Sequence, residues 1–335
     1  MKIEILKPPF GPIFDGIIPE LYTGKNLLIK QSQPYATAHL AVGFLLKAAD
    51  GALLGRAALY NNPSLCLEGK QVIALGAYEC VSDNAASWAL IDAVEAYCKK
   101  AFPDFLVIGP MDGSSWKTYR YVTEGLEHGP FLFEPFFLPY YPEQWRAAGF
   151  SELMCYASNL AYIDESHRND FTAAQKAFES NGLVFRTLDV SDQDAELRRL
   201  AKFNLKAFQS AFLFSEITEA EFMLNNQKTM AFLLPKLVHL VLDGDEICGM
   251  ILAYPDLLDP DGKTAVVKTL ARLPGARYRG LGDLLCDKIV ASLLDAGFQK
   301  MIHALMRVGN DSLVNSSKFW GEGYKRYTLF QYLPA

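Results

Sequence analysis

Residues 274–283, Pro-Gly-Ala-Arg-Tyr-Arg-Gly-Leu-Gly-Asp, decide how this chain of 335 residues is interpreted. The stretch leads into a segment whose apolar residues recur every four positions, the pattern of a core-facing helix: Leu281, Leu285, Ile289 and Leu293. Gly280 and Gly282 let the backbone come close to a ligand where the first-turn N–H groups point outward. Three nearby arginines add positive charge: Arg272, Arg277 and Arg279. The stretch therefore predicts a site for a polyphosphate.

The chain also repeats itself at a separation of 193 to 195 residues. Asp50-Gly51 and Asp243-Gly244 each stand between two apolar runs, as in a tight β-hairpin. Residues 85–110 and 280–305 each read as a helix followed by a short strand, and an apolar run precedes each helix. The repeated unit is therefore hairpin, strand, helix, strand, which agrees with the two domains expected for this length.

Each half carries an addition of its own. The first half has 21 extra residues within 110–141, and this insertion contains six large rings: Phe131, Phe133, Phe136, Phe137, Tyr140 and Tyr141. Rings of this size favour packing between the halves over lining a substrate pocket. The second half gains two helices that begin near Ser191 and Thr218, where capping sequences occur. A polar stretch at 164–170 marks the boundary.

The order strand, Pro, Arg-x-x-Gly-x-Gly, helix, strand resembles the GNAT superfamily of acyl-CoA-dependent N-acyltransferases, whose pyrophosphate loop reads [RQ]-x-x-G-x-[GA]. Arg277, Gly280 and Gly282 match that loop, and Pro274 precedes it as in the family. The arrangement is also similar to that of uncharacterised bacterial proteins with two GNAT-like units. In the first half, Asp83 puts a negative charge where a pyrophosphate would lie, so we expect that half not to bind the cofactor.

The resemblance implies an α/β (α+β) fold with two tandem GNAT-like domains, each a mixed, mostly antiparallel sheet with helices on both faces. The expected divisions are an N-terminal degenerate domain at 1–165, a linker and helix at 166–182, and a C-terminal domain with the acyl-CoA site at 183–335.

The resemblance also implies acetyl-CoA as the cofactor. Backbone groups of Leu270, Ala271 and Arg272 would bind the pantetheine arm. The loop would hold the pyrophosphate through its N–H groups, which belong to Arg277, Tyr278, Arg279, Gly280, Leu281, Gly282 and Asp283. Asn310 falls near an asparagine that contacts the cofactor in the family, although Gly309-Asn310-Asp311-Ser312 is equally a good turn.

Catalytic groups are less clearly marked. Phe319 stands where many family members have the tyrosine that protonates the departing thiolate, so the acid would be water, Tyr324 or Tyr327. Three carboxylates lie in segments that flank the acceptor side of the family's fold: Glu216, Glu219 and Asp256. Each reads equally well as a surface or capping residue. Glu216, Asp256 and Tyr324 are our predicted catalytic residues.

The predicted function is transfer of acetyl from acetyl-CoA to a primary amine of a small molecule or peptide by direct attack. A non-catalytic acyl-CoA-binding or regulatory module is one alternative. The other is a relative of the Fem-type aminoacyltransferases, which pair two GNAT-like units and use aminoacyl-tRNA. The net charge of −6 argues against that last reading and against nucleic-acid partners in general.

Composition narrows the remaining classes. No stretch reaches about 18 apolar residues without a charge, and the first residues lack the apolar run of a signal peptide, so we expect a cytoplasmic protein with no membrane partner. The six cysteines and five histidines are dispersed without zinc spacing, so we expect no metal site. The protein would be a monomer or a homodimer.

Overall fold

The computed structural model describes residues 1–16, 18–230 and 232–332. Its elements in the first half are listed here in chain order: β1 (Lys2–Leu6), α1 (Pro12–Asp15), the 3-10 turn η1 (Pro19–Leu21), α2 (Gly24–Gln31), β2 (Leu40–Lys47), β3 (Leu53–Tyr60), β4 (Cys66–Leu67), β5 (Lys70–Cys80), α3 (Asn84–Ala101), β6 (Leu106–Gly109), β7 (Tyr121–Glu124), α4 (Tyr141–Ala147) and β8 (Ser151–Tyr162).

The second half repeats this order with additions. Its elements are η2 (Glu165–His167), α5 (Thr172–Ser180), β9 (Leu183–Thr187), α6 (Gln193–Phe208), α7 (Glu219–Met230), η3 (Pro235–Leu237), β10 (Val238–Asp243), β11 (Glu246–Pro255), β12 (Thr264–Arg272), η4 (Ala276–Tyr278), α8 (Leu281–Asp295), β13 (Lys300–Arg307), α9 (Asp311–Lys318) and β14 (Glu322–Tyr332).

The sequence repeat is confirmed in the structure. β2–β3 and β10–β11 are antiparallel hairpins that turn at Asp50-Gly51 and Asp243-Gly244, and both turn glycines have positive φ. The strand, helix and strand that follow are β5–α3–β6 in the first half and β12–α8–β13 in the second, and each pair of strands is parallel. The fold is therefore α/β with a mostly antiparallel sheet, as the sequence predicts.

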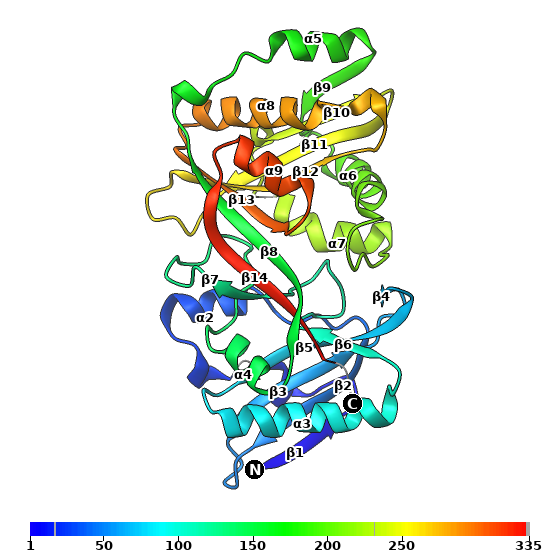
Figure 1. Ribbon diagram of the computed structural model, residues 1–335, viewed down its shortest axis with the longest axis vertical. Coiled ribbons are helices and arrows are strands. Elements are labelled where there is room, and N and C mark those ends of the chain that lie inside the picture. Colours follow the sequence, from blue (N-terminus) through cyan, green and yellow to red (C-terminus); the bar gives the residue numbers. More distant parts are fainter. Residues whose placement is uncertain (17, 231, 333–335) are drawn as a thin grey trace.

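The sequence did not reveal that one sheet runs through both halves. Its strand order is β1-β2-β3-β5-β6-β14-β8-β13-β12-β11-β10-β9, with β4 and β7 attached at the side. The last strand of each half crosses to the other half: β8 pairs with β13, and β14 pairs with β6. β8 and β14 also pair with each other along most of their length, and Figure 1 shows these two long strands crossing the middle of the molecule.

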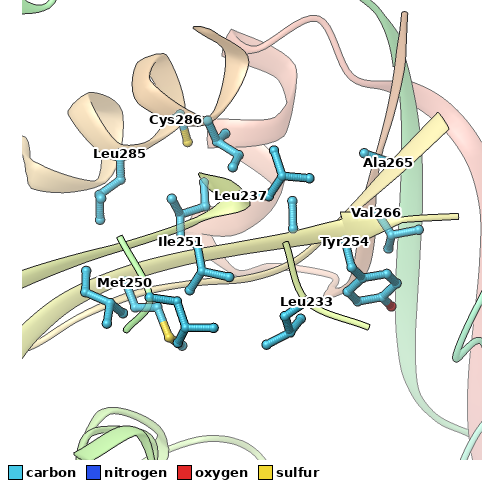
Figure 2. Close-up of a cluster of buried hydrophobic side chains, with 14 of the residues drawn as sticks. Leu233, Leu237, Met250, Ile251, Tyr254, Ala265, Val266, Leu285 and Cys286 are labelled. Carbon is cyan, nitrogen blue, oxygen red and sulfur yellow. The ribbon is translucent and has the colours of Figure 1, made fainter. Parts of the chain in front are cut away.

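Helices cover both faces of the sheet in the second half. α8 and α6 both pack on β11, and Figure 2 shows Leu285 and Cys286 of α8 on one side of the strands, with Leu233 and Met250 on the other. The stripe predicted for α8 lies in the core, where Leu281, Leu285, Ile289 and Leu293 are at most 2% exposed. Burial of this stripe is the hydrophobic term that fixes α8 on the sheet.

The aromatic insertion packs between the halves, as predicted. Phe131 belongs to the core of the second half, whereas Phe137 packs on the core of the first. Glu134 forms a buried ion pair with Lys325 of β14, at 2.8 Å from Oε2 to Nζ. The insertion therefore joins the halves through both apolar and charged contacts.

Two further findings concern the described part of the chain. None of its helices combines the length and the apolar character needed to cross a bilayer. It also contains no group of three or more His, Cys, Asp or Glu side chains arranged to hold a metal ion.

Candidate active site at the diverging strands

The site begins where β12 and β13 separate. Their parallel pairing extends only from Thr264↔Lys300 to Val267↔His303, although both strands continue beyond it. On the other side of β12, the register with β11 shifts so that Lys268 has no opposite residue. Lys268 is thus the extra residue of a β-bulge, a feature that redirects side chains and is frequent beside active sites.

A cavity of about 990 Å³ occupies this divergence. Its walls include β12, β13, α8, α9, the segment 206–212 at the end of α6 and directly after it, and two tyrosines of the first half, Tyr119 and Tyr156. Seven predicted cofactor residues line it: Leu270, Ala271, Arg272, Gly280, Gly282, Asp283 and Asn310. The structure therefore brings together the strand and the loop that the sequence assigned to one ligand.

The N-terminus of α8 opens onto this cavity. Gly280 is the N-cap residue, has a φ of 84°, and offers no side-chain cap. A Cβ built on Gly282 would meet no atom within 4 Å, so there is free space in front of this backbone. In the first half, by contrast, the Asp83 carboxylate caps α3 by accepting a hydrogen bond from the Ala85 N–H at 2.8 Å. Only α8 of these two helices leaves its N-terminus free for an anion.

The other predicted cofactor residues lie outside the cavity lining. The Arg277 guanidinium binds the Asp243 carboxylate, with Nε to Oδ2 at 3.0 Å, and also donates to the Asn181 carbonyl. The Tyr278 hydroxyl donates to Asp243 as well. Arg279 is exposed, and Leu281 is a core residue. Arg277 and Tyr278 therefore tie the loop to the β10–β11 turn.

Asn310 caps a helix and also lines the cavity. Its side chain caps α9 by accepting a hydrogen bond from the Asp311 N–H at 2.8 Å, and the residue also lines the cavity. A capping function and a contact with a ligand are therefore compatible at this position.

The predicted catalytic residues are not brought together. Glu216 is exposed in the segment between α6 and α7, and Asp256 is buried, with its carboxylate accepting the N–H groups of Leu132 and Leu258. Burial raises the pKa of Asp256. The ring of Tyr324 stacks on His128 at 4.4 Å, and burial raises the pKa of Tyr324 to about 12. None of these three lines the cavity.

The hydroxyl of Tyr327, the other predicted acid, forms its hydrogen bonds outside the cavity. Its hydroxyl hydrogen bonds with Glu134 at 2.5 Å and with Ser158 at 3.0 Å, and the residue is fully buried. It does not line the cavity.

A histidine and a serine that the sequence analysis passed over do line the cavity. His303 Nδ1 lies 2.7 Å from Ser316 Oγ, and the Asn159 amide donates to the same oxygen at 2.9 Å. The serine hydrogen can therefore donate to Nδ1, the arrangement in which the His303 proton lies on Nε2. Burial lowers the pKa of His303 to about 4, so the ring is neutral at pH 7. No spacing rule links these three positions, because they come from β8, β13 and α9.

Lys268 is the second missed residue. It is the one charged residue in the run Val-Val-Lys-Thr-Leu at 266–270, and this interruption was the available signal. Its side chain is exposed in the cavity, and the cavity walls reduce the hydration of its ammonium. This desolvation, together with the charge of Arg120, lowers the pKa of Lys268 to about 8.

Residues 197–316 match the model of the Acetyltransferase (GNAT) family. This segment belongs to the GNAT family. It contains β12, the loop, α8 and β13, and therefore every predicted cofactor residue. No curated protein matches the chain.

Solved structures extend the GNAT likeness to both halves. A tandem GNAT protein from the clavulanic acid biosynthesis pathway is 11% identical, with 100% of this chain and 99% of that chain covered and a TM-score of 0.50. A GCN5-related N-acetyltransferase from Sphaerobacter thermophilus is 11% identical, with coverage of 92% and 85% and a TM-score of 0.53. Another from Anabaena variabilis is 9% identical, with coverage of 100% and 73% and a TM-score of 0.56. At these identities the likeness concerns the fold.

The GNAT segment does not contain the whole site. Tyr119 and Tyr156 come from the first half, and β8, the neighbour of β13, also precedes the matched residues. The first half therefore completes one wall of the cavity in the GNAT segment.

Proposed function

We propose that this protein is an N-acetyltransferase that moves the acetyl group of acetyl-CoA to a primary amine. The observation that carries the proposal is the cavity that joins the free N-terminus of α8 to the divergence of β12 and β13. A polyphosphate fits the free N-terminus of α8, and an extended arm with an acyl group fits the space between the diverging strands.

The residues present fit such a cofactor. The N–H groups at 281–283 would hold the pyrophosphate, because the α8 N-terminus has no side-chain cap and Gly282 leaves free space in front of it. Backbone groups of Leu270, Ala271 and Arg272 would bind the arm, since these residues line the cavity beyond the last β12–β13 pair. When bound, acetyl-CoA would supply an activated thioester.

Transfer forms a C–N bond at the acceptor and breaks the C–S bond of the thioester, so the site must accept an amine proton and stabilise a departing thiolate. His303 supports the second task, because its Nε2–H faces no hydrogen-bond acceptor among the described residues. For the first task we favour Glu216 over Asp256. The Glu216 carboxylate is exposed and follows the cavity-lining segment 206–212 in the chain, whereas the Asp256 carboxylate already accepts two backbone N–H groups.

One observation favours a second function, a non-catalytic acyl-CoA-binding module. Phe319, which cannot donate a proton, lines the cavity where many GNAT enzymes have a tyrosine. Release of free thiol from acetyl-CoA during incubation with a panel of primary amines would separate the two functions. Thiol release above the rate without amine supports the enzyme, whereas tight CoA binding without thiol release supports the module.

Gly282→Asp tests the cofactor site. The new Cβ meets no atom, and the φ of Gly282 is not positive, so the fold should persist while a carboxylate enters the anion site. We expect CoA affinity, measured by titration calorimetry, to fall about 10- to 100-fold from like-charge repulsion in a confined site. Gly11→Asp is the matched control, since Gly11 is the N-cap of α1 and is equally open. Equal CoA affinity in both variants would refute the site.

A further inference from the structure

Arg120 is a buried cation without an anion. It is 4% exposed, and its Nε and Nη1 have no hydrogen-bond partner among the described residues. None of the ion pairs in the described chain includes it. Its backbone has a φ of 64°, an uncommon conformation for a residue with a side chain. A charged guanidinium removed from water without a partner is costly, so an anion is expected beside it.

Arg120 is not itself a lining residue of the cavity, but it contacts two residues of the cavity wall. Its Cζ lies 4.1 Å from the ring centre of Tyr119 and 4.3 Å from that of Tyr156, and both rings line the cavity. Lys268 lines the same cavity and feels the charge of Arg120. Among the described residues, two cations without an ion-pair partner therefore lie on the side of the cavity that the first half closes: Lys268 in its lining and Arg120 against the two tyrosines.

The carboxylates that line the cavity lie at the N-termini of two helices and not beside Arg120. Asp283 and Asp311 are the acidic residues among the described lining, and they stand in the first turns of α8 and α9. Asp283 is moreover paired with Lys318. Neither is positioned to neutralise Arg120.

We propose that Arg120 and Lys268 form a subsite for a carboxylate carried by one of the two reactants. This proposal rests on the proposed transferase function and adds the class of substrate. The pyrophosphate is not the anion in question. Lys268 precedes Arg272 by four residues, which is about 13 Å along an extended strand, and the loop lies beyond Arg272.

Two reactants could carry the carboxylate. An acceptor such as an α-amino acid would place it beside the attacking amine, and a dicarboxylic acyl group such as succinyl would place it on the donor. The tyrosine rings suit either source, because they add apolar area around a charged group.

The test varies the carboxylate on the donor and on the acceptor independently. Thiol release is measured with acetyl-CoA or succinyl-CoA as donor and with amino acids or their carboxamides as acceptors, so that each pair differs in one carboxylate. We expect the preferred reactant to have a KM about 10- to 100-fold below that of its uncharged partner. Lys268→Met and Arg120→Gln should remove most of this preference, measured as the ratio of kcat/KM for the charged reactant to that for its uncharged partner. Lys202→Met, an exposed lysine of α6, is the matched control.

Three outcomes overturn the subsite: no preference for a carboxylate on either reactant, a preference that persists in both variants, or an equal loss of activity with charged and uncharged partners, which would indicate a structural role for Arg120.

A second experiment distinguishes failure of the carboxylate subsite from failure of the proposed transferase function. If no amine gives thiol release, thermal unfolding with CoA is compared with and without N-acetylglycine. Stabilisation of the wild type that is lost in Lys268→Met supports the subsite alone, and absence of stabilisation overturns it.

Discussion

The buried pair between Glu134 and Lys325 gives a direct test of how the halves are joined. Both side chains are 2% exposed, and the Lys325 ammonium otherwise binds only the Gly129 carbonyl among the described residues. Glu134→Gln keeps the volume of the side chain but removes its charge, which leaves a buried ammonium without an anion. Loss of one partner of a buried pair costs about 3–5 kcal/mol of unfolding free energy.

The assay is urea denaturation followed by circular dichroism. With a slope of about 3 kcal/mol per molar urea, a loss of about 4 kcal/mol lowers the midpoint by roughly 1 M. The double variant Glu134→Leu/Lys325→Met should recover most of the loss, because apolar residues of similar volume replace buried pairs at little cost. The Tyr327 hydroxyl retains Ser158 as a partner in that variant.

A surface pair provides the control. Lys202 and Glu246 are also close, at 2.5 Å, but both are exposed, so Glu246→Gln should leave the midpoint unchanged within error. The reasoning fails if Glu134→Gln behaves like this control, or if the double variant is no more stable than the single one.

The remaining predictions concern acid stability and the exchanged strands. Burial lowers the pKa of His303 and of His239 to about 4, below the usual 6.5, so the unfolded state binds more protons between these values. The contribution of each histidine to the unfolding free energy should therefore be fully present above pH 6.5 and fall by about 1.4 kcal/mol per pH unit toward pH 4. His303→Gln should reduce this slope in denaturation series at pH 5 to 7. A fragment of residues 166–335 lacks β8, the partner of both β13 and β14, so it should show no cooperative unfolding transition; a sharp transition in that fragment would contradict the exchange.

Much of the fold was predictable because its signals are local. Asp50-Gly51 and Asp243-Gly244 mark hairpins since a tight turn needs positive φ, and the four-residue period at 281–293 marks α8 since one face must be buried. The loop at 274–283 was recognisable for the same reason: the residues that would meet a pyrophosphate are consecutive.

The rest of the site was not predictable, because it depends on contacts between distant segments. Arg120 comes from the loop before β7, Lys268 from β12 and His303 from β13, and each alone reads as an ordinary residue. The assignments of Glu216, Asp256 and Tyr324 stay predictions, and their positions outside the cavity lining weaken them.

The sequence by itself determined two copies of one α/β unit and predicted one anion-binding loop, since turn chemistry, helical periodicity and glycine spacing act within a few residues. Only the tertiary structure decided that β8 and β14 exchange halves. The pattern of a strand sets which of its faces is buried, but it does not specify which neighbour satisfies its backbone N–H and C=O groups. That exchange places Tyr156 of β8 in the cavity wall, where it contacts the buried Arg120.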